Sequence, residues 1–199
     1  MFWSKAAGFY DLFENIYNKK VYTELGDRVA ELIGERDSVL ECACGTGAIS
    51  VSIAKKCRSL IATDYADGML RRARKKLALY KNVKIEKADI TNLSFLDNSF
   101  DKVVAGNVIH LLTEPYAALK ELERVCKNGG ELIIPTYINN SSNSNRAAVR
   151  FLELIGVNFS RRFDRKTYEE FFLSLGYKNV KHYVVEGRMA CDIAVIKLD

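Results

Sequence analysis

The 199-residue sequence lacks long apolar runs and any large excess of charge, and each shortage excludes a class of protein. No stretch approaches the roughly 20 apolar residues that a membrane-spanning helix requires. The opening MFWSKAAGFYDLF has neither the apolar core nor the small-residue cleavage site of a secretion signal. The 30 Lys and Arg exceed the 25 Asp and Glu by a formal charge of only +5, which is too little for a dedicated nucleic-acid-binding face. We therefore expect a cytoplasmic protein with no membrane span and no nucleic-acid partner.

Cysteine is also scarce, with five residues at scattered positions and no CxxC spacing. An odd number without paired spacing indicates neither a disulfide framework nor a structural zinc site. Cys42 and Cys44 form a CxC, but no third ligand lies near them in the sequence, so we predict that they pack in the interior. The sequence thus predicts free, buried thiols and no metal site.

From Ser38 onward, apolar runs of strand length alternate with amphipathic segments of helical spacing. The expected strands are 38–43, 59–64, 83–89, 100–106 and 130–137, followed by two more in 177–199. This alternation is typical of a doubly wound α/β fold with helices on both faces of a parallel sheet. We expect a seven-stranded, mostly parallel sheet whose last strand is inserted antiparallel.

We interpret the whole chain, 1–199, as one domain, either monomeric or homodimeric. Its expected parts are an N-terminal helical lid over the ligand cleft (1–36), a ligand-binding core (37–137), a helical segment on the acceptor side (138–176) and a closing β-hairpin (177–199). The basic run RRARKK (71–76) is interpreted as the solvated face of a helix.

A glycine turn, Gly45-Thr46-Gly47, follows the first expected strand. Such a turn places backbone N–H groups and a helix N-terminus at the carboxyl edge of the sheet, where open α/β folds bind ligands. A GxGxxS pattern occurs often by chance, but three acids accompany it. Glu41, Asp64 and Asp89 lie at the ends of the first three expected strands, so all three should meet at that edge.

The positions of these acids favour one kind of ligand. Asp64 can accept two hydrogen bonds from a ribose diol, and Asp89 can accept one from the amine of adenine. Glu41, so close to the glycines, would repel a pyrophosphate but would attract an ammonium group. A ligand with adenine, ribose, no phosphate and an amino acid tail is S-adenosyl-L-methionine, whose methyl-transfer product is S-adenosyl-L-homocysteine.

These motifs resemble those of the Rossmann-like (class I) S-adenosylmethionine-dependent methyltransferases, and most closely the small-molecule enzymes of ubiquinone and menaquinone biosynthesis. The resemblance covers roughly 39–137 and rests on four blocks in the expected order: VLECACGTG, IATDYADGML, KADITNLSFLDNSFDKVVAGNVIHLL and ELERVCKNGGELIIPTY. Ala43 departs from the pattern, because that group more often has glycine there. We expect this alanine to tighten the turn and to weaken cofactor contact slightly.

The resemblance also implies a set of cofactor-binding residues. They are Tyr10 closing over the cofactor, Glu41 at its amino group, the backbone around Cys42, Ala43, Gly45 and Gly47 along its tail, Asp64 at the ribose, Tyr65 and Met69 beside adenine, Asp89 and Ile90 at the adenine edge, and Asn107 through its carbonyl group.

The acceptor side is expected to involve 2–22 and 138–165, where aromatic residues such as Tyr17 suggest an apolar or aromatic small molecule. Tyr137, at the end of the fifth expected strand, is a further candidate for the acceptor pocket. His110 follows the fourth strand, and its near-neutral pKa would suit a general base toward a hydroxyl acceptor. A purely structural role for His110 remains the alternative, because displacement at a sulfonium centre needs mainly alignment and exclusion of water.

Two other functions remain open from the sequence. YAALK (116–120) supplies the YxxxK of nicotinamide-dependent short-chain dehydrogenases, although it precedes the fifth strand rather than following it. A non-catalytic protein that binds S-adenosylmethionine or S-adenosylhomocysteine would keep the same cofactor motifs. An enclosed cavity beside the methyl group would distinguish an enzyme from such a binding protein.

Overall fold

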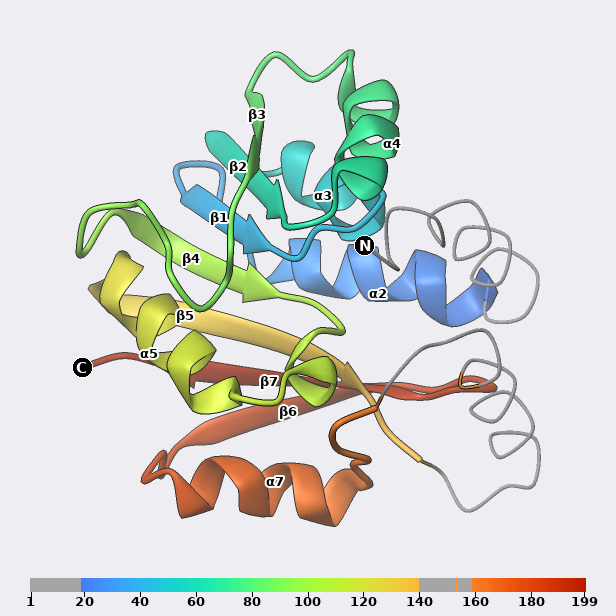
Figure 1. The fold of residues 1–199 in the computed structure, drawn as a ribbon, viewed down its shortest axis with the longest axis vertical. Coiled ribbons are helices and arrows are strands. Elements are labelled where there is room, and N and C mark those ends of the chain that lie inside the picture. The colour runs from blue at the N-terminus through green and yellow to red at the C-terminus, as the bar shows by residue number, and fades with distance from the viewer. Residues whose placement is uncertain (1–18, 140–152, 154–158) are drawn as a thin grey trace.

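The fold is built on one seven-stranded sheet, seen in a computed structural model that describes residues 19–139, 153 and 159–199 (Figure 1). The strands are β1 (Ser38–Cys42), β2 (Ser59–Asp64), β3 (Val83–Lys87), β4 (Phe100–Ala105), β5 (Cys126–Tyr137), β6 (Val180–Val185) and β7 (Cys191–Lys197). The helices are α2 (Lys19–Glu31), α3 (Ala48–Ala54), α4 (Asp67–Leu77), α5 (Pro115–Val125) and α7 (Arg165–Ser174), with a 3₁₀ turn η1 (Ile109–Leu111) after β4. The order of elements confirms the predicted α/β class.

The strand order is β3-β2-β1-β4-β5-β7-β6. All pairs from β3 to β5 are parallel, whereas β7 is antiparallel to both β5 and β6. The last strand is therefore inserted antiparallel, as predicted. The order reverses between β1 and β4, which is the place where open parallel sheets form a crevice for ligands.

Each face of the sheet has its own hydrophobic core, because successive residues of a strand point to opposite faces. On β5, Leu132 and Ile134 pack with α5 and α7, whereas Ile133 packs with α2, α3 and α4. Figure 1 shows α5 in front of the sheet and α2 and α3 behind it. The two faces are covered by separate helices, as a doubly wound fold requires.

The N-terminal part of the chain is helical where it is described, in α2. A Cβ atom at Gly26 would lie 2.9 Å from Ser52 Oγ, so the glycine allows α2 to pack closely on α3. Tyr22 and Leu25 of the same helix line the cavity described below. The expected lid in 1–36 lies outside the described residues up to residue 18.

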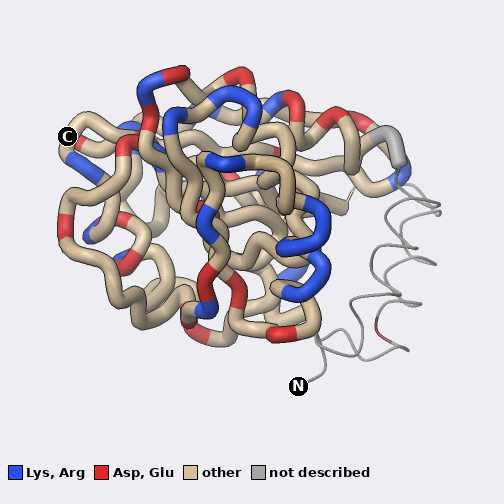
Figure 2. Tube along the Cα trace, turned by 90° about the horizontal axis from the view of Figure 1, so that it is seen from above, with Lys and Arg blue, Asp and Glu red and all other residues tan. Residues whose placement is uncertain are grey.

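The basic run on α4 is solvent-exposed. The buried face of this helix carries Met69, Leu70, Ala73 and Leu77, while the Lys and Arg residues lie opposite. Seen from above, where α4 is nearest the viewer, these residues form a nearly continuous basic stretch (Figure 2). The prediction of a solvated helix face is confirmed.

The segment after β5 supplies α7, which begins with a capping box. The Asp164 carboxylate accepts a hydrogen bond from the Thr167 N–H at 2.8 Å, and the Thr167 hydroxyl accepts one from the Asp164 N–H at 2.9 Å. The helix is anchored to the sheet by Tyr168, which is fully buried and donates its hydroxyl to the Ile134 carbonyl at 2.7 Å. Residues 140–152 and 154–158 of the helical segment expected at 138–176 lie outside the described residues.

Several expected strand limits were wrong. β5 begins at Cys126 rather than Gly130, and a register shift between the pairs of Phe100 and Lys102 accommodates the additional residues. β1, β3 and β4 end one or two residues earlier than expected, so Asp89 follows β3 instead of ending it.

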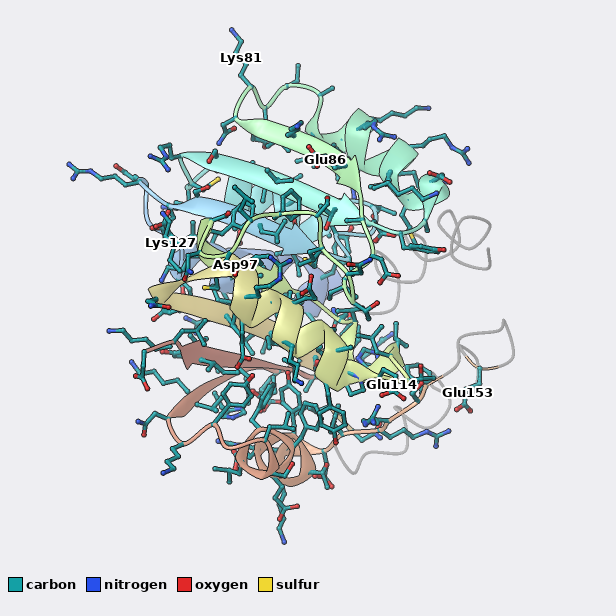
Figure 3. All side chains as sticks on the ribbon, turned by 60° about the vertical axis from the view of Figure 1, so that its left-hand side comes forward. Lys81, Glu86, Asp97, Glu114, Lys127 and Glu153 are labelled. Atoms are coloured by element: carbon teal, nitrogen blue, oxygen red, sulfur yellow. The ribbon has the colours of Figure 1, made fainter. Side chains whose placement is uncertain are left out.

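In Figure 3, Lys127 near the start of β5 and Glu114 before α5 lie at opposite ends of the domain. Glu114 and Glu153 are at the end where the parallel strands finish.

Within the described residues, no helix is long and apolar enough to span a membrane, and no cluster of His, Cys, Asp or Glu could hold a metal ion. All five cysteines are free and buried. Burial raises the pKa of the Cys42 thiol to about 12, so this group stays protonated and inert near neutral pH.

Candidate active site

A cavity of about 400 Å³ lies at the carboxyl edge of the parallel strands. Its walls come from the segments that follow β1, β2, β3, β4 and β5, together with α2 and the described residues near 159 and 189. The cavity has the size and the place expected of a small-ligand site in an α/β sheet.

The glycine turn forms the floor of this cavity through its backbone. Ala43, Gly45 and Gly47 all have positive φ, at 54°, 56° and 83°. A Cβ atom at Gly45 would meet nothing within 4 Å, so the peptide there is open to a ligand. Ala43 occupies a left-handed conformation that favours glycine, in keeping with the glycine that the resemblance implies at this position.

Glu41 projects from β1 toward the α3 face and is only 2% exposed. The Ser50 hydroxyl, in the first turn of α3, donates a hydrogen bond to Oε2 at 2.5 Å. Burial raises the pKa of Glu41 to about 8, an effect that the nearby Asp64 charge reinforces and the Ser50 hydrogen bond opposes. Burial disfavours the ionised form of such a carboxyl group because it removes the hydration of the negative charge. A cationic group on a ligand would stabilise the ionised form again.

Asp64 ends β2 and connects the second strand to the glycine turn. Oδ2 accepts a hydrogen bond from the Gly45 N–H at 2.9 Å, and Oδ1 accepts one from the Ala66 N–H at 2.8 Å. Burial raises the pKa of Asp64, although these backbone donors oppose the shift. Each carboxylate oxygen has two acceptor sites, so both can still accept a hydroxyl from the cavity.

Asp89 and Tyr65 lie on the outer, β3 side of the cavity. Asp89 is exposed, and its Oδ1 accepts hydrogen bonds from the Thr91 N–H at 2.9 Å and the Thr91 hydroxyl at 2.7 Å. Tyr65 is 71% exposed, and the Lys87 ammonium lies 5.7 Å from the centre of its ring. Met69 and Ile90, both buried, complete this side of the cavity wall.

The β4 and β5 side of the cavity is different in character. Asn107 has φ 52° and donates its N–H to the Pro135 carbonyl at 2.8 Å, which fixes the start of the loop after β4. His110 and Tyr137 also line this side. Most of their neighbours here are apolar: Val108, Leu111, Leu112, Phe159 and Met189.

The structure brings most of the predicted site residues together, but not all of them. Cys42 does not line the cavity, because its side chain alternates with Glu41 and packs in the core on the α5 face. Gly47 is not among the lining residues, although its neighbours Thr46 and Ala48 are; it is the N-cap of α3, where a Cβ atom would lie 3.2 Å from Leu77 Cδ1. Tyr10 and Tyr17 lie outside the described residues.

Sequence reasoning missed several residues around the site. Ser50 was recognised only as the serine of the GxGxxS pattern. Its position in the first turn of α3 brings its hydroxyl within hydrogen-bond distance of Glu41. Met189 lines the cavity from a distant part of the chain, and nothing local in the sequence marks it. Tyr22 also lines the cavity and is the last residue of the segment 2–22 that was expected on the acceptor side. Outside the cavity lining, His182 is paired with Asp192, whose side chain is fully buried. The His182 Nδ1 and Asp192 Oδ1 atoms are 2.9 Å apart.

The YxxxK pair is not part of the site. Tyr116 and Lys120 lie on α5, and neither lines the cavity. Tyr116 is 46% exposed and contacts Phe171 of α7, with ring centres 6.2 Å apart. Their position gives no support to a dehydrogenase.

Comparison with known proteins agrees with this geometry. Residues 40–134 match the methyltransferase domain family. A demethylmenaquinone methyltransferase from Clavibacter sepedonicus is 40% identical over 106 residues, which are 53% of this chain and 42% of that protein. One from Staphylococcus aureus is 33% identical over 129 residues, which are 62% and 54% of the two chains. The chain thus spans about half the length of these curated relatives.

The similarity in fold extends over the whole chain. A structure described as a SAM-dependent methyltransferase, possible histamine N-methyltransferase, from Thermotoga maritima superimposes with a TM-score of 0.78 at 21% identity, covering 100% of this chain and 99% of that one. The resemblance that the four sequence blocks indicated is therefore confirmed. Residues 40–134 are thus similar to the methyltransferase domain family, and the fold of the chain is the one found in structures of Rossmann-like, class I S-adenosylmethionine-dependent methyltransferases.

Proposed function

We propose that this protein binds S-adenosylmethionine in the carboxyl-edge cavity and transfers its methyl group to a small-molecule acceptor, as a cytoplasmic enzyme. One observation carries the proposal. Glu41, Asp64 and Asp89, from three adjacent strand ends, line a single cavity around an open glycine turn. This is the arrangement that the ammonium, ribose and adenine parts of the cofactor require.

The residues present fit the cofactor. Glu41 is a buried acid whose Oε2 accepts a hydrogen bond from the neutral Ser50 hydroxyl, so it suits an ammonium group. Asp64 suits the ribose hydroxyls, and the exposed peptide at Gly45 suits the tail between them. Asp89 with the Ile90 N–H suits the edge of adenine, with Tyr65 and Met69 beside the ring. Bound in this way, the cofactor supplies a methyl group on a sulfonium centre.

What the chain itself contributes is alignment and exclusion of water. The glycine turn and the acids hold one reactant at the β3 to β1 side, and the apolar wall after β4 and β5 holds the other beside it. Holding two reactants in the correct geometry removes much of the entropic cost of bringing them together from the activation barrier, so a dedicated acid or base is not required. The apolar wall favours a hydrophobic, ring-bearing acceptor, in keeping with relatives named for demethylmenaquinone.

The same wall favours an enzyme over a protein that only binds the cofactor. A cofactor-binding protein needs the acids and the glycine turn, but it has no use for a further apolar space beyond β1. Here Phe159, from the segment after β5, and Met189, from the turn between β6 and β7, extend the cavity past the proposed cofactor side.

Calorimetric titration with S-adenosylmethionine, S-adenosylhomocysteine and NAD tests the proposal. We expect micromolar binding of the first two and no binding of NAD, since an ammonium group stabilises the ionised form of Glu41 whereas a pyrophosphate disfavours it. Glu35→Gln, a substitution of an exposed carboxylate far from the cavity lining, serves as the matched control and should bind like the wild type. Binding of NAD alone would overturn the proposal.

A further inference from the structure

Two helices from different parts of the chain pack around the glycine turn. A Cβ atom at Gly47 would lie 3.4 Å from Ala73 Cα, so α4 lies directly against the turn. On α2, a Cβ atom at Gly26 would lie 3.7 Å from the Ala48 carbonyl oxygen, at the start of α3. Tyr22 lies one helical turn before Gly26 on the same face of α2, and it lines the cavity. Side chains of α2 and α4 can therefore meet beside the turn.

Lys76 of α4 makes this connection. Its ammonium group donates one hydrogen bond to the Tyr22 hydroxyl at 3.2 Å and another to the Thr46 hydroxyl at 3.3 Å. Tyr22 and Thr46 both line the cavity, whereas Lys76 approaches them from the exposed face of α4. The two bonds place a positive charge next to the cavity wall on the side of the glycine turn.

The Tyr22 hydroxyl is suited to bind an anion. An ammonium group has donors and no acceptor, so the Tyr22 oxygen accepts the bond from Lys76. That bond does not use the hydrogen of the Tyr22 hydroxyl, which can be donated to a ligand. A hydroxyl that accepts a hydrogen bond from a cation is also a stronger donor, because bonds in a chain polarise one another. Tyr22 thus presents an O–H donor that a positive charge supports.

The cavity lining supplies negative charge and needs a positive charge nearby. Three acids line the cavity, and no Lys or Arg is among its described lining residues. The tail of S-adenosylmethionine carries an ammonium group and a carboxylate on the same carbon atom. A carboxylate held close to ionised Glu41 is repelled unless a cation lies near it. Lys87 lies on the other, β3 side and is paired with Asp67 at 2.8 Å, whereas Lys76 supplies positive charge on the glycine-turn side.

We propose that Lys76 and Tyr22 recognise the carboxylate of the cofactor tail, with the Tyr22 hydroxyl as its donor and the Lys76 ammonium group as its counter-ion. This inference rests on the proposed function, because it assigns the glycine-turn side of the same cavity to the amino acid part of the cofactor. It also moves Tyr22 from the acceptor side, where the sequence placed it, to the cofactor side. Together with Glu41, the two residues make the site select ligands that carry a complete amino acid tail.

Two ligands that differ only in the carboxylate test this role. S-adenosylhomocysteine carries the carboxylate, and decarboxylated S-adenosylhomocysteine keeps the ammonium group without it. Calorimetry measures the ratio of the two affinities for the wild type, Lys76→Met, Lys76→Arg and Tyr22→Phe. Methionine keeps much of the apolar stem of Lys76 and removes its charge, whereas arginine keeps the charge. Lys75→Met is the matched control, because it removes an equal charge from an exposed neighbour that does not contact the cavity lining.

The wild type should prefer S-adenosylhomocysteine by about tenfold or more, the effect of a hydrogen bond to a charged group. Lys76→Met and Tyr22→Phe should reduce this preference by about three- to tenfold without changing the affinity for the decarboxylated ligand, since the Lys76 charge is partly screened by solvent. Lys76→Arg and Lys75→Met should retain the preference.

Three results would overturn the inference. The first is an equal preference in the wild type and Lys76→Met. The second is an equal weakening of both ligands in Lys76→Met, which is the result expected if the bonds of Lys76 only support the packing of α2 and α4. The third is a wild type that binds the two ligands with the same affinity. Failure of the wild type to bind S-adenosylhomocysteine would instead overturn the proposed function.

Discussion

Glu41→Gln should change how stability depends on pH. The folded protein holds the Glu41 proton up to a pKa of about 8, whereas the unfolded chain releases it near 4.5. Between these values the folded state binds more protons than the unfolded state, so the free energy of unfolding falls as pH rises. Burial of Glu41 therefore does not lower the free energy of unfolding below about pH 4.5, and lowers it by the full amount above about pH 8. Glutamine keeps the shape and the contact with Ser50 but carries no charge.

The magnitude follows from the pKa difference. At about 1.4 kcal/mol per unit, the interval from 4.5 to about 8 corresponds to at most about 5 kcal/mol. Urea unfolding of the ligand-free wild type and Glu41→Gln at several pH values between 5 and 8 measures it, because other titrating groups are common to both proteins. The stability of Glu41→Gln relative to the wild type should rise by several kcal/mol across this range, while Glu35→Gln should show no such trend. A constant difference between wild type and Glu41→Gln would refute the account of this carboxylate.

Binding of the cofactor should release the proton that Glu41 carries in the ligand-free protein. At pH 6.5 the wild-type Glu41 is protonated and the cofactor amino group is charged, so binding should release close to one proton. Calorimetry in buffers of different ionisation enthalpy detects that release. Glu41→Gln should release none and should bind more weakly; proton release equal to that of the wild type would place the ammonium group elsewhere.

Three further substitutions probe the site and its supports. Asp64→Asn should weaken S-adenosylmethionine binding by about 1.5–3 kcal/mol in calorimetry, since it removes the charge that faces the ribose hydroxyls, and unchanged affinity would remove that assignment. Ala43→Gly should leave the free energy of unfolding unchanged or raise it by up to about 1 kcal/mol, because glycine relieves the strain of a φ of 54°. The control Ala117→Gly, at an exposed position of α5, should lower the free energy of unfolding by about 1 kcal/mol. Equal losses in the two variants would argue against strain at Ala43. Tyr168→Phe should lower the free energy of unfolding by about 1–2 kcal/mol through loss of the hydrogen bond to Ile134, with cofactor affinity intact, and a matching loss of affinity would contradict the separation of α7 from the cofactor side.

The meeting of the three acids at one cavity was predictable from the sequence. The reason is that parallel strands end at one edge, so the acids Glu41, Asp64 and Asp89 could be placed together once the strands were recognised. The antiparallel insertion of β7 was also foreseen, because 177–199 contains two strand patterns joined by a short turn.

The rest depended on tertiary packing that no local pattern records. Cys42 was predicted to contact the cofactor through its backbone, and strand alternation turns its side chain away from Glu41 and into the core. Met189 reaches the cavity only because β7 lies beside β5. The burial of His110 Nδ1 without a hydrogen-bond partner also becomes visible only in three dimensions.

The most direct test of the central claim is a crystal structure with S-adenosylhomocysteine. We predict that the ligand lies along the carboxyl edge of β1, β2 and β3, with its amino group at Glu41, its ribose hydroxyls at Asp64 and its adenine at Asp89. A ligand bound at another place, or bound in this cavity with the ribose away from Asp64, would contradict the account.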